Sequence, residues 1–182
     1  MARSEEGALD DLIEAVKLDG EYKKFRLLLK NSRTELKIER DRKEALALLA
    51  GRTSRELYGK RQFSPKAMLE AASNDMAARS RLVEIRVRMK VHIDLLEDAC
   101  KAIKNHMLTE YADQMRLFTN QESRTAFVER VQGTARTLLV QGQALIDMLD
   151  QIVIDIDKAS YHMSNMTSMI VLLDGSKGSK NI

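Results

Sequence analysis

The segment from residue 51 to residue 63 brings positive charge and aromatic rings together. It reads Gly-Arg-Thr-Ser-Arg-Glu-Leu-Tyr-Gly-Lys-Arg-Gln-Phe, and its two glycines favour a loop. Lysine and arginine bind the phosphates of nucleic acids by displacing counterions, and aromatic rings stack on unpaired bases. The segment is therefore predicted to bind single-stranded nucleic acid through six side chains: Arg52, Arg55, Tyr58, Lys60, Arg61 and Phe63.

Charge is distributed unevenly along the 182 residues. Residues 22–90 carry 19 lysines and arginines against 8 acidic residues, whereas residues 1–21 and 91–182 are each net negative. The net charge of +3 thus conceals a strongly basic middle, which favours a polyanionic partner. The alternative is an ordinary solvated surface, and acidic residues interleaved in the same region favour it: Glu35, Glu39, Asp41 and Glu44.

Part of this basic middle falls on a long predicted helix. At 100° per residue, Arg79, Arg86 and Lys90 lie near one another on one face, and Arg81 and Arg88 share an adjacent face. These faces either extend the binding surface for nucleic acid or are solvated sides of the helix, and both interpretations stay open.

No arrangement of side chains suited to catalysis or metal binding is evident in the sequence. The three histidines, at positions 92, 106 and 162, are scattered, and there is no glycine-rich phosphate loop or nucleophile–base pair. Cys100 is the single cysteine, which excludes an internal disulfide and indicates a reducing cytoplasm. We therefore expect a protein that is not an enzyme and that holds no metal or cofactor.

The longest predicted helix begins at Pro65, the single proline of the chain. Ser64 supplies a capping oxygen, and proline is favoured at the first helical position. Residues 66–118 contain neither proline nor glycine. Apolar residues recur there every three or four positions, which is a helical period: Leu82, Ile85, Met89, Ile93, Leu96, Cys100, Ile103, Met107, Tyr111, Met115 and Phe118.

Three other segments are predicted to be helical. Residues 5–19 form a short acidic amphipathic helix that Gly20 ends or kinks, and residues 21–50 form a second helix. Residues 124–173 follow a heptad repeat that includes Thr134 and a polar Gln141, and Asp174-Gly175 ends this helix. The seam of this repeat is the expected oligomerisation surface, formed by Leu138, Leu145, Met148, Ile152 and Ile156.

Together these elements predict an all-α fold, in which long helices form an extended bundle or coiled coil that is oligomeric. Residues 1–118 form a basic helical domain, residues 119–174 the C-terminal heptad helix, and residues 175–182 a flexible tail. No stretch approaches the ~18 apolar residues of a membrane span, and no signal peptide opens the chain. We expect a cytoplasmic protein without a membrane partner.

Several short motifs in residues 9–118 resemble those of a known family. The run Glu39-Arg-Asp-Arg-Lys-Glu-Ala-Leu-Ala-Leu-Leu leads into Arg55-Glu-Leu-Tyr-Gly-Lys, and Leu95-Leu-Glu-Asp-Ala-Cys-Lys-Ala-Ile-Lys-Asn precedes Asp113-Gln-Met-Arg-Leu-Phe. In these motifs the chain resembles the UvsY-type recombination mediators of T-even-like phages. It departs from them in having fewer tyrosines in this region and about 60 further residues after Phe118.

The resemblance implies a non-enzymatic oligomer that binds single-stranded DNA. Such mediators load a RecA-like recombinase onto strands covered by single-strand-binding protein, and a phage-encoded member would act in the host cytoplasm. Arg55, Tyr58 and Lys60 would fall on the basic Tyr-Gly loop of the family. The alternative is a phage-type structural, virion or assembly protein that oligomerises through its heptads and uses its charges only for solubility or packing.

Overall fold

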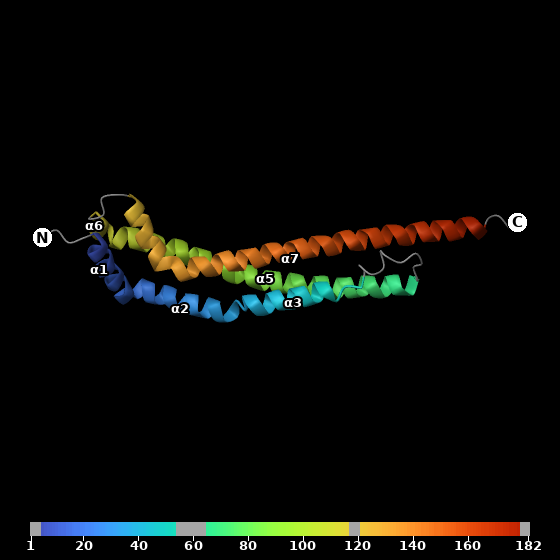
Figure 1. Ribbon diagram of the computed structural model, residues 1–182, viewed down its shortest axis with the longest axis horizontal. Helices are drawn as coiled ribbons and strands as arrows, with labels where there is room; N and C mark the ends of the chain where they lie inside the picture. The colour runs from blue at the N-terminus through green and yellow to red at the C-terminus, as the bar shows by residue number, and fades with distance from the viewer. Residues whose placement is uncertain (1–4, 54–64, 117–120, 179–182) are drawn as a thin grey trace. The chain divides into compact units, whose positions relative to one another are not determined.

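The computed structural model describes residues 5–53, 65–116 and 121–178, and the regular structure in these ranges is entirely helical. The prediction of an all-α fold is confirmed. Figure 1 shows the helices in chain order: α1 (Glu5–Leu18), α2 (Gly20–Glu35), α3 (Ile38–Ala50), α5 (Pro65–Glu110), the single turn α6 (Ala112–Met115) and α7 (Gln121–Gly178).

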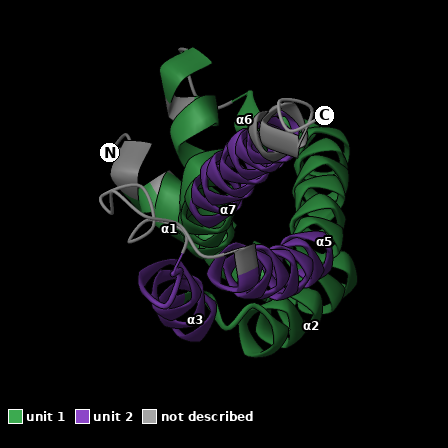
Figure 2. Ribbon diagram, turned by 90° about the vertical axis from the view of Figure 1, so that its right-hand side faces the viewer, with its two compact units in different colours: residues 1–38, 89–144 green, residues 39–88, 145–182 purple. Residues whose placement is uncertain are grey.

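The chain divides into two compact units (Figure 2), and each long helix contributes to both. The first unit comprises residues 1–38 and 89–144, and the second comprises residues 39–88 and 145–182. This division differs from the predicted boundary at residue 118. The reason is that α5 and α7 each continue through both units. The boundary between the units therefore falls within these helices and not in the segment that connects them.

In the first unit, α2 and the start of α7 pack on the second half of α5. The predicted apolar stripe of α5 forms the core, because its members from Met89 to Met107 are all buried. Buried residues of α2, among them Phe25 and Leu29, and of α7, among them Phe127 and Ala135, complete it. The helical period of the sequence therefore identified the buried face of α5 correctly.

Two contacts show how closely α7 approaches α5 in this unit. The Gln132 side-chain amide donates a hydrogen bond of 2.5 Å to the backbone carbonyl of Cys100, and both groups are buried. Gly142 is buried as well, and a methyl group added there would overlap the Cδ1 atom of Ile93 and lie 3.0 Å from its Cγ1 atom. Gly142 is thus the point at which the absence of a side chain permits close packing.

We expect replacement of Gly142 by alanine to destabilise the protein by about 1–3 kcal/mol, because overpacking outweighs the gain in helix propensity. Gly133 is the matched control, since it lies in the same helix with nothing within 4 Å of an added methyl group. Gly133→Ala should stabilise by up to about 1 kcal/mol. Urea unfolding followed by circular dichroism measures both changes. Equal shifts of the two variants would contradict the close approach.

In the second unit, α3 and the C-terminal part of α7 pack on the first half of α5. Its core contains Leu82 and Ile85 of the predicted stripe together with Ala45 of α3. On α7 the buried residues are Leu145, Ile146, Leu149, Ile152, Ile156 and Met163. The stripe of α5 also continues toward its N-terminus through Met68, Ala71, Asp75 and Ala78, all buried.

The prediction of one helix over residues 21–50 is wrong, because the chain leaves the helical conformation at Leu36, between α2 and α3. Leu36 is buried and has φ −77° and ψ 81°. Ser32 is the last buried residue of α2 and Leu36 follows the end of that helix, whereas the next buried residues are Asp41 and Ala45 of α3. The step of five residues from Leu36 to Asp41 does not fit the three- or four-residue steps of one continuous helical face. The break at Leu36 therefore allows the buried residues of α3 to face the core again.

The two other long helices differ from prediction at their ends. The helix from Pro65 was expected to reach Phe118, but α5 ends at Glu110, and Tyr111 (φ −105°) separates it from α6. The Tyr111 hydroxyl donates to Asp19, a tertiary contact that the local sequence does not reveal. α7 was expected to stop at Asp174-Gly175 but continues to Gly178, and residues 179–182 lie outside the described residues.

In the first unit the predicted heptad of α7 matches the buried positions at Phe127 and Leu138 but not at its polar positions. Thr134 and Gln141 were assigned to the seam but are exposed, whereas Gln132 and Ala135 are buried. The reason is that α7 packs against two helices, which bury a wider and differently centred arc than a two-stranded seam does. The polar residue in the core is therefore Gln132 and not Gln141.

Within α7, residues Arg124–Leu172 also meet the length and composition criteria of a helix that can cross a membrane, with an 18-residue window of mean hydropathy 1.2. The expectation that no stretch approaches such a span needs this correction. The same criteria are met by core helices, and 28% of this window is buried inside the chain.

Candidate nucleic-acid interface

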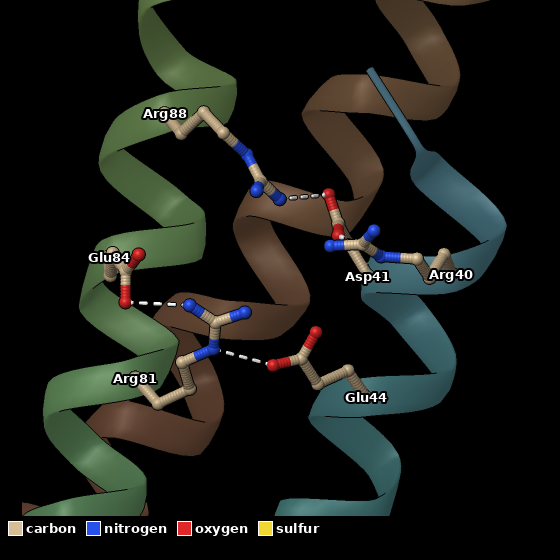
Figure 3. A network of polar contacts seen from close by, with 6 residues as sticks. All are labelled: Arg40, Asp41, Glu44, Arg81, Glu84 and Arg88. Atoms are coloured by element: carbon tan, nitrogen blue, oxygen red, sulfur yellow. Dashed lines mark hydrogen bonds and ion pairs between the residues drawn. The ribbon is translucent and has the colours of Figure 1, made fainter. Parts of the chain in front are cut away.

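The cations predicted on one face of α5 are paired with α3 in the second unit (Figure 3). Arg88 Nη2 donates to Asp41 Oδ2 at 2.6 Å, and Asp41 is completely buried. Arg81 donates to Glu44 at 2.5 Å and to Glu84 at 2.7 Å. The hydrogen bond with Arg81 is the main cause that lowers the pKa of the Glu44 carboxyl, so this carboxylate stays charged at neutral pH.

Of the three cations on the adjacent predicted face of α5, Arg79 and Arg86 are paired with α7, whereas Lys90 pairs with Asp94 of α5 itself at 2.8 Å. Arg79 donates to both carboxylate oxygens of Asp157, at 2.6 and 3.2 Å. Arg86 pairs with Asp150 in the same way, seven residues later on α5 and seven residues earlier on α7. The grouping of these arginines into two faces is confirmed, but each face meets a carboxylate-bearing helix. These four arginines therefore bridge α5 to α3 or α7 within the second unit and are not free for phosphate.

Arg52 was predicted to contact nucleic acid, and the structure places it elsewhere. Its side chain is only 3% exposed and Asp75 is 0% exposed. Arg52 Nε donates to Asp75 Oδ1 at 3.1 Å, and Arg52 Nη2 donates to Asp75 Oδ2 at 2.9 Å. The sequence signal for this pair was an acid at a stripe position, because Asp75 continues the spacing of Ala71, Ala78 and Leu82. The other five predicted contacts lie outside the described residues: Arg55, Tyr58, Lys60, Arg61 and Phe63.

The side chains predicted for oligomerisation face the interior of the chain. Leu138, Leu145, Ile152 and Ile156 are buried, and Met148 is half-buried. An oligomer joined through these residues would have to displace contacts within the chain. Oligomerisation thus stays a prediction, and the exposed surfaces are the regions available for it.

A series of cations to which the described residues offer no partner lies on α2 and, in the case of its last member, just beyond the end of that helix, in the first unit. Its members recur every three or four residues and are all exposed: Lys23, Arg26, Lys30, Arg33 and Lys37. We call this series the α2 stripe. Its first four members span an arc of about 80° on the helix. Across residues 5–53, 65–116 and 121–178, no side-chain hydrogen bond or ion pair is made by any of the five. Lys24, by contrast, pairs with Glu21 at 2.6 Å.

The α2 stripe borders a groove between α2 and α7. Arg33 lines it from α2, and the residues from α7 are Gly133, Thr134, Thr137, Leu138 and Gln141. Its volume is about 460 Å³. No aspartate or glutamate occurs in α7 between Glu129 and Asp147. These cations entered the sequence-based prediction only through the net charge of residues 22–90, and their regular spacing was the signal that could have singled them out.

A histidine, an aspartate and a tyrosine meet at the start of α2. His106 Nε2 lies 3.0 Å from Asp19 Oδ2, and the Tyr111 hydroxyl donates to the same oxygen at 3.2 Å. Asp19 Oδ1 accepts from the Tyr22 backbone N–H, which caps α2. Burial alone would raise the pKa of Asp19, but these hydrogen bonds outweigh it and lower that pKa. The cluster has a structural role, because the Asp19 carboxylate already bonds to three partners, which connect the start of α2 to the end of α5.

His106 also borders a cavity of about 360 Å³ between α2 and α5, lined mainly by Phe25, Leu28, Ala99, Ala102 and Ile103. The two charged residues that also line it, Glu21 and Lys24, are paired with each other at 2.6 Å. The thiol of Cys100 is buried, and burial raises its pKa, so it is protonated and unreactive at neutral pH.

In the part of the chain that the structure describes, no group of three or more side chains is placed to hold a metal ion. Comparison of the chain with protein-family models, with curated proteins and with solved structures finds no match.

Proposed function

We propose that this protein binds single-stranded DNA without catalysing a reaction. The observation that carries the proposal is the α2 stripe, whose exposed cations find no partner among the described residues, while the arginines of α5 are paired with carboxylates. A line of fixed positive charge attracts a line of phosphates and releases their counterions. In the proposal, the three cations and two aromatic residues predicted between residues 55 and 63 also contact the strand, since they have the composition that stacks on unpaired bases.

The resemblance to the UvsY-type mediators supports a more specific role. In that role the protein would act as an oligomer that loads a RecA-like recombinase onto DNA covered by single-strand-binding protein. Binding of single-stranded DNA is the first requirement of such a role, and it is therefore the property to test first.

The test is the salt dependence of binding to a fluorescently labelled oligothymidylate. The triple variant Lys23→Gln/Arg26→Gln/Lys30→Gln should flatten the slope of log affinity against log salt concentration by about 2, because each lost contact with a single strand removes about 0.7. At low salt its affinity should fall on the order of tens of fold.

The matched control removes the same charge from cations that already have partners. Lys24, Lys101 and Arg116 each pair with a carboxylate three residues away, namely Glu21, Asp98 and Asp113. Replacing the three cations by glutamine should leave the slope nearly unchanged. Identical slopes for both triple variants would refute a role of the α2 stripe. If the unmodified protein showed no binding at physiological salt, the structural or virion alternative would be favoured.

A further inference from the structure

The groove between α2 and α7 has the dimensions and the chemistry of a site for one nucleotide. Its volume of about 460 Å³ falls within the range of roughly 300–1,000 Å³ that is usual for small-molecule sites. Gly133 leaves its floor open, because nothing lies within 4 Å of an added methyl group there. Access is unobstructed on the α7 side, where Thr134, Thr137 and Gln141 are all exposed.

Three hydrogen-bond donors converge on this groove from two helices. Arg33 brings a planar guanidinium, which binds phosphate oxygens in a bidentate manner. Thr134 adds a hydroxyl and Gln141 an amide. The described residues offer none of these three side chains a hydrogen-bond partner or an ion pair. The Thr137 hydroxyl, by contrast, donates to the Gly133 carbonyl at 3.1 Å and offers only an acceptor.

The electrostatic surroundings favour an anion in this groove. The carboxylates nearest to it in the sequence of α7 are Glu129 and Asp147, and Glu129 is paired with Arg136 at 2.7 Å. On the α2 side the stripe continues from Arg33 through Lys30 and Arg26. A strand of nucleic acid whose phosphate binds Arg33 can therefore place its next phosphates beside further cations of the same helix. A single free phosphate would contact Arg33 alone.

We infer that the groove seats one nucleotide of a single strand of nucleic acid. Arg33 binds its phosphate, and Thr134 and Gln141 hydrogen-bond to that phosphate or to the unpaired base. The neighbouring phosphates follow the α2 stripe toward Lys23. Only a single strand can place its base in the groove, because the bases of a duplex are paired inside the helix. This inference rests on the proposed function and assigns it a specific site.

The first experiment separates the groove from the α2 stripe. Thr134→Val/Gln141→Ala should weaken binding of a labelled oligothymidylate about tenfold, with an unchanged salt slope, because neutral hydrogen bonds and not charges are lost. Arg33→Gln should flatten the slope by about 0.7. Thr109→Val is the control, since Thr109 is an exposed threonine of α5 whose hydroxyl donates to a backbone carbonyl. It should bind like the unmodified protein.

The second experiment locates the strand without depending on affinity. Thr137→Cys places a thiol in the groove, and Thr109→Cys places one on α5 in the same kind of setting, because both threonines are exposed and donate to the carbonyl four residues earlier. The buried Cys100 contributes little background to alkylation by N-ethylmaleimide. Oligothymidylate should slow alkylation several-fold at position 137 and leave position 109 unaffected.

The outcomes distinguish the two proposals. Loss of affinity in Thr134→Val/Gln141→Ala together with protection at position 137 supports the nucleotide site. Normal affinity of that variant without protection at position 137 overturns the site, while the slope change in the triple variant of the α2 stripe would still support the proposed function. No binding by the unmodified protein overturns both.

Discussion

Replacement of Arg52 by methionine is expected to destabilise the fold by about 3–5 kcal/mol. The variant leaves the Asp75 carboxylate without its charged partner at a position that is 0% exposed. A buried charge without a partner costs far more than the ion pair itself contributes. The cost falls on the second unit, because the pair ties the segment after α3 to the first half of α5. Urea unfolding monitored by circular dichroism measures it.

The double variant Arg52→Met/Asp75→Leu provides the control for this interpretation. Removing both charges together replaces the ion pair by apolar contacts, which is often neutral or stabilising. The double variant should therefore recover most of the stability that the single variant loses. A loss below about 1 kcal/mol in Arg52→Met would argue against a buried pair. A flatter salt slope of DNA binding in the folded double variant would restore Arg52 as a contact to DNA.

Asp19→Ala is expected to destabilise the protein by about 2–4 kcal/mol, because one carboxylate serves three partners. Loss of the N-cap of α2 accounts for about 0.5–2 kcal/mol. The lost hydrogen bonds from His106 and Tyr111 add about 0.5–1.5 kcal/mol each. Thermal and urea unfolding at neutral pH measure the sum. Asp19→Asn is the matched variant, since asparagine still caps a helix but carries no charge.

The same carboxylate makes stability depend on pH. The pKa of Asp19 is lower in the folded protein than in the unfolded chain, where it is about 3.9. The unfolded state therefore binds the proton first, and the contribution of Asp19 to stability is present above pH ~4 and is lost as the pH falls through the folded pKa. Asp19→Asn should lack this component. A full acid-dependent loss in Asp19→Asn would show that other carboxylates account for it.

The fold class and the buried face of α5 could be read from the sequence. Apolar residues from Leu82 to Met107 recur at a helical period, and the same residues are buried. A period of 3.6 is a property of one helix and needs no knowledge of its neighbours. The break at Leu36 and the shifted buried arc of α7 could not be found in this way, because both arise from how a helix meets two others.

For the candidate site, too, one part could be predicted from the sequence and another part could not. Composition identified a basic middle, and the angular grouping of the α5 arginines into two faces was correct. Whether a cation is free was decided by carboxylates far away in the chain: Asp41 for Arg88, Asp157 for Arg79 and Asp75 for Arg52, which are 47, 78 and 23 residues apart. Sequence lists the charges, but only tertiary packing brings opposite charges within hydrogen-bond distance. That packing neutralises the arginines of α5 and leaves the lysines and arginines of the α2 stripe exposed.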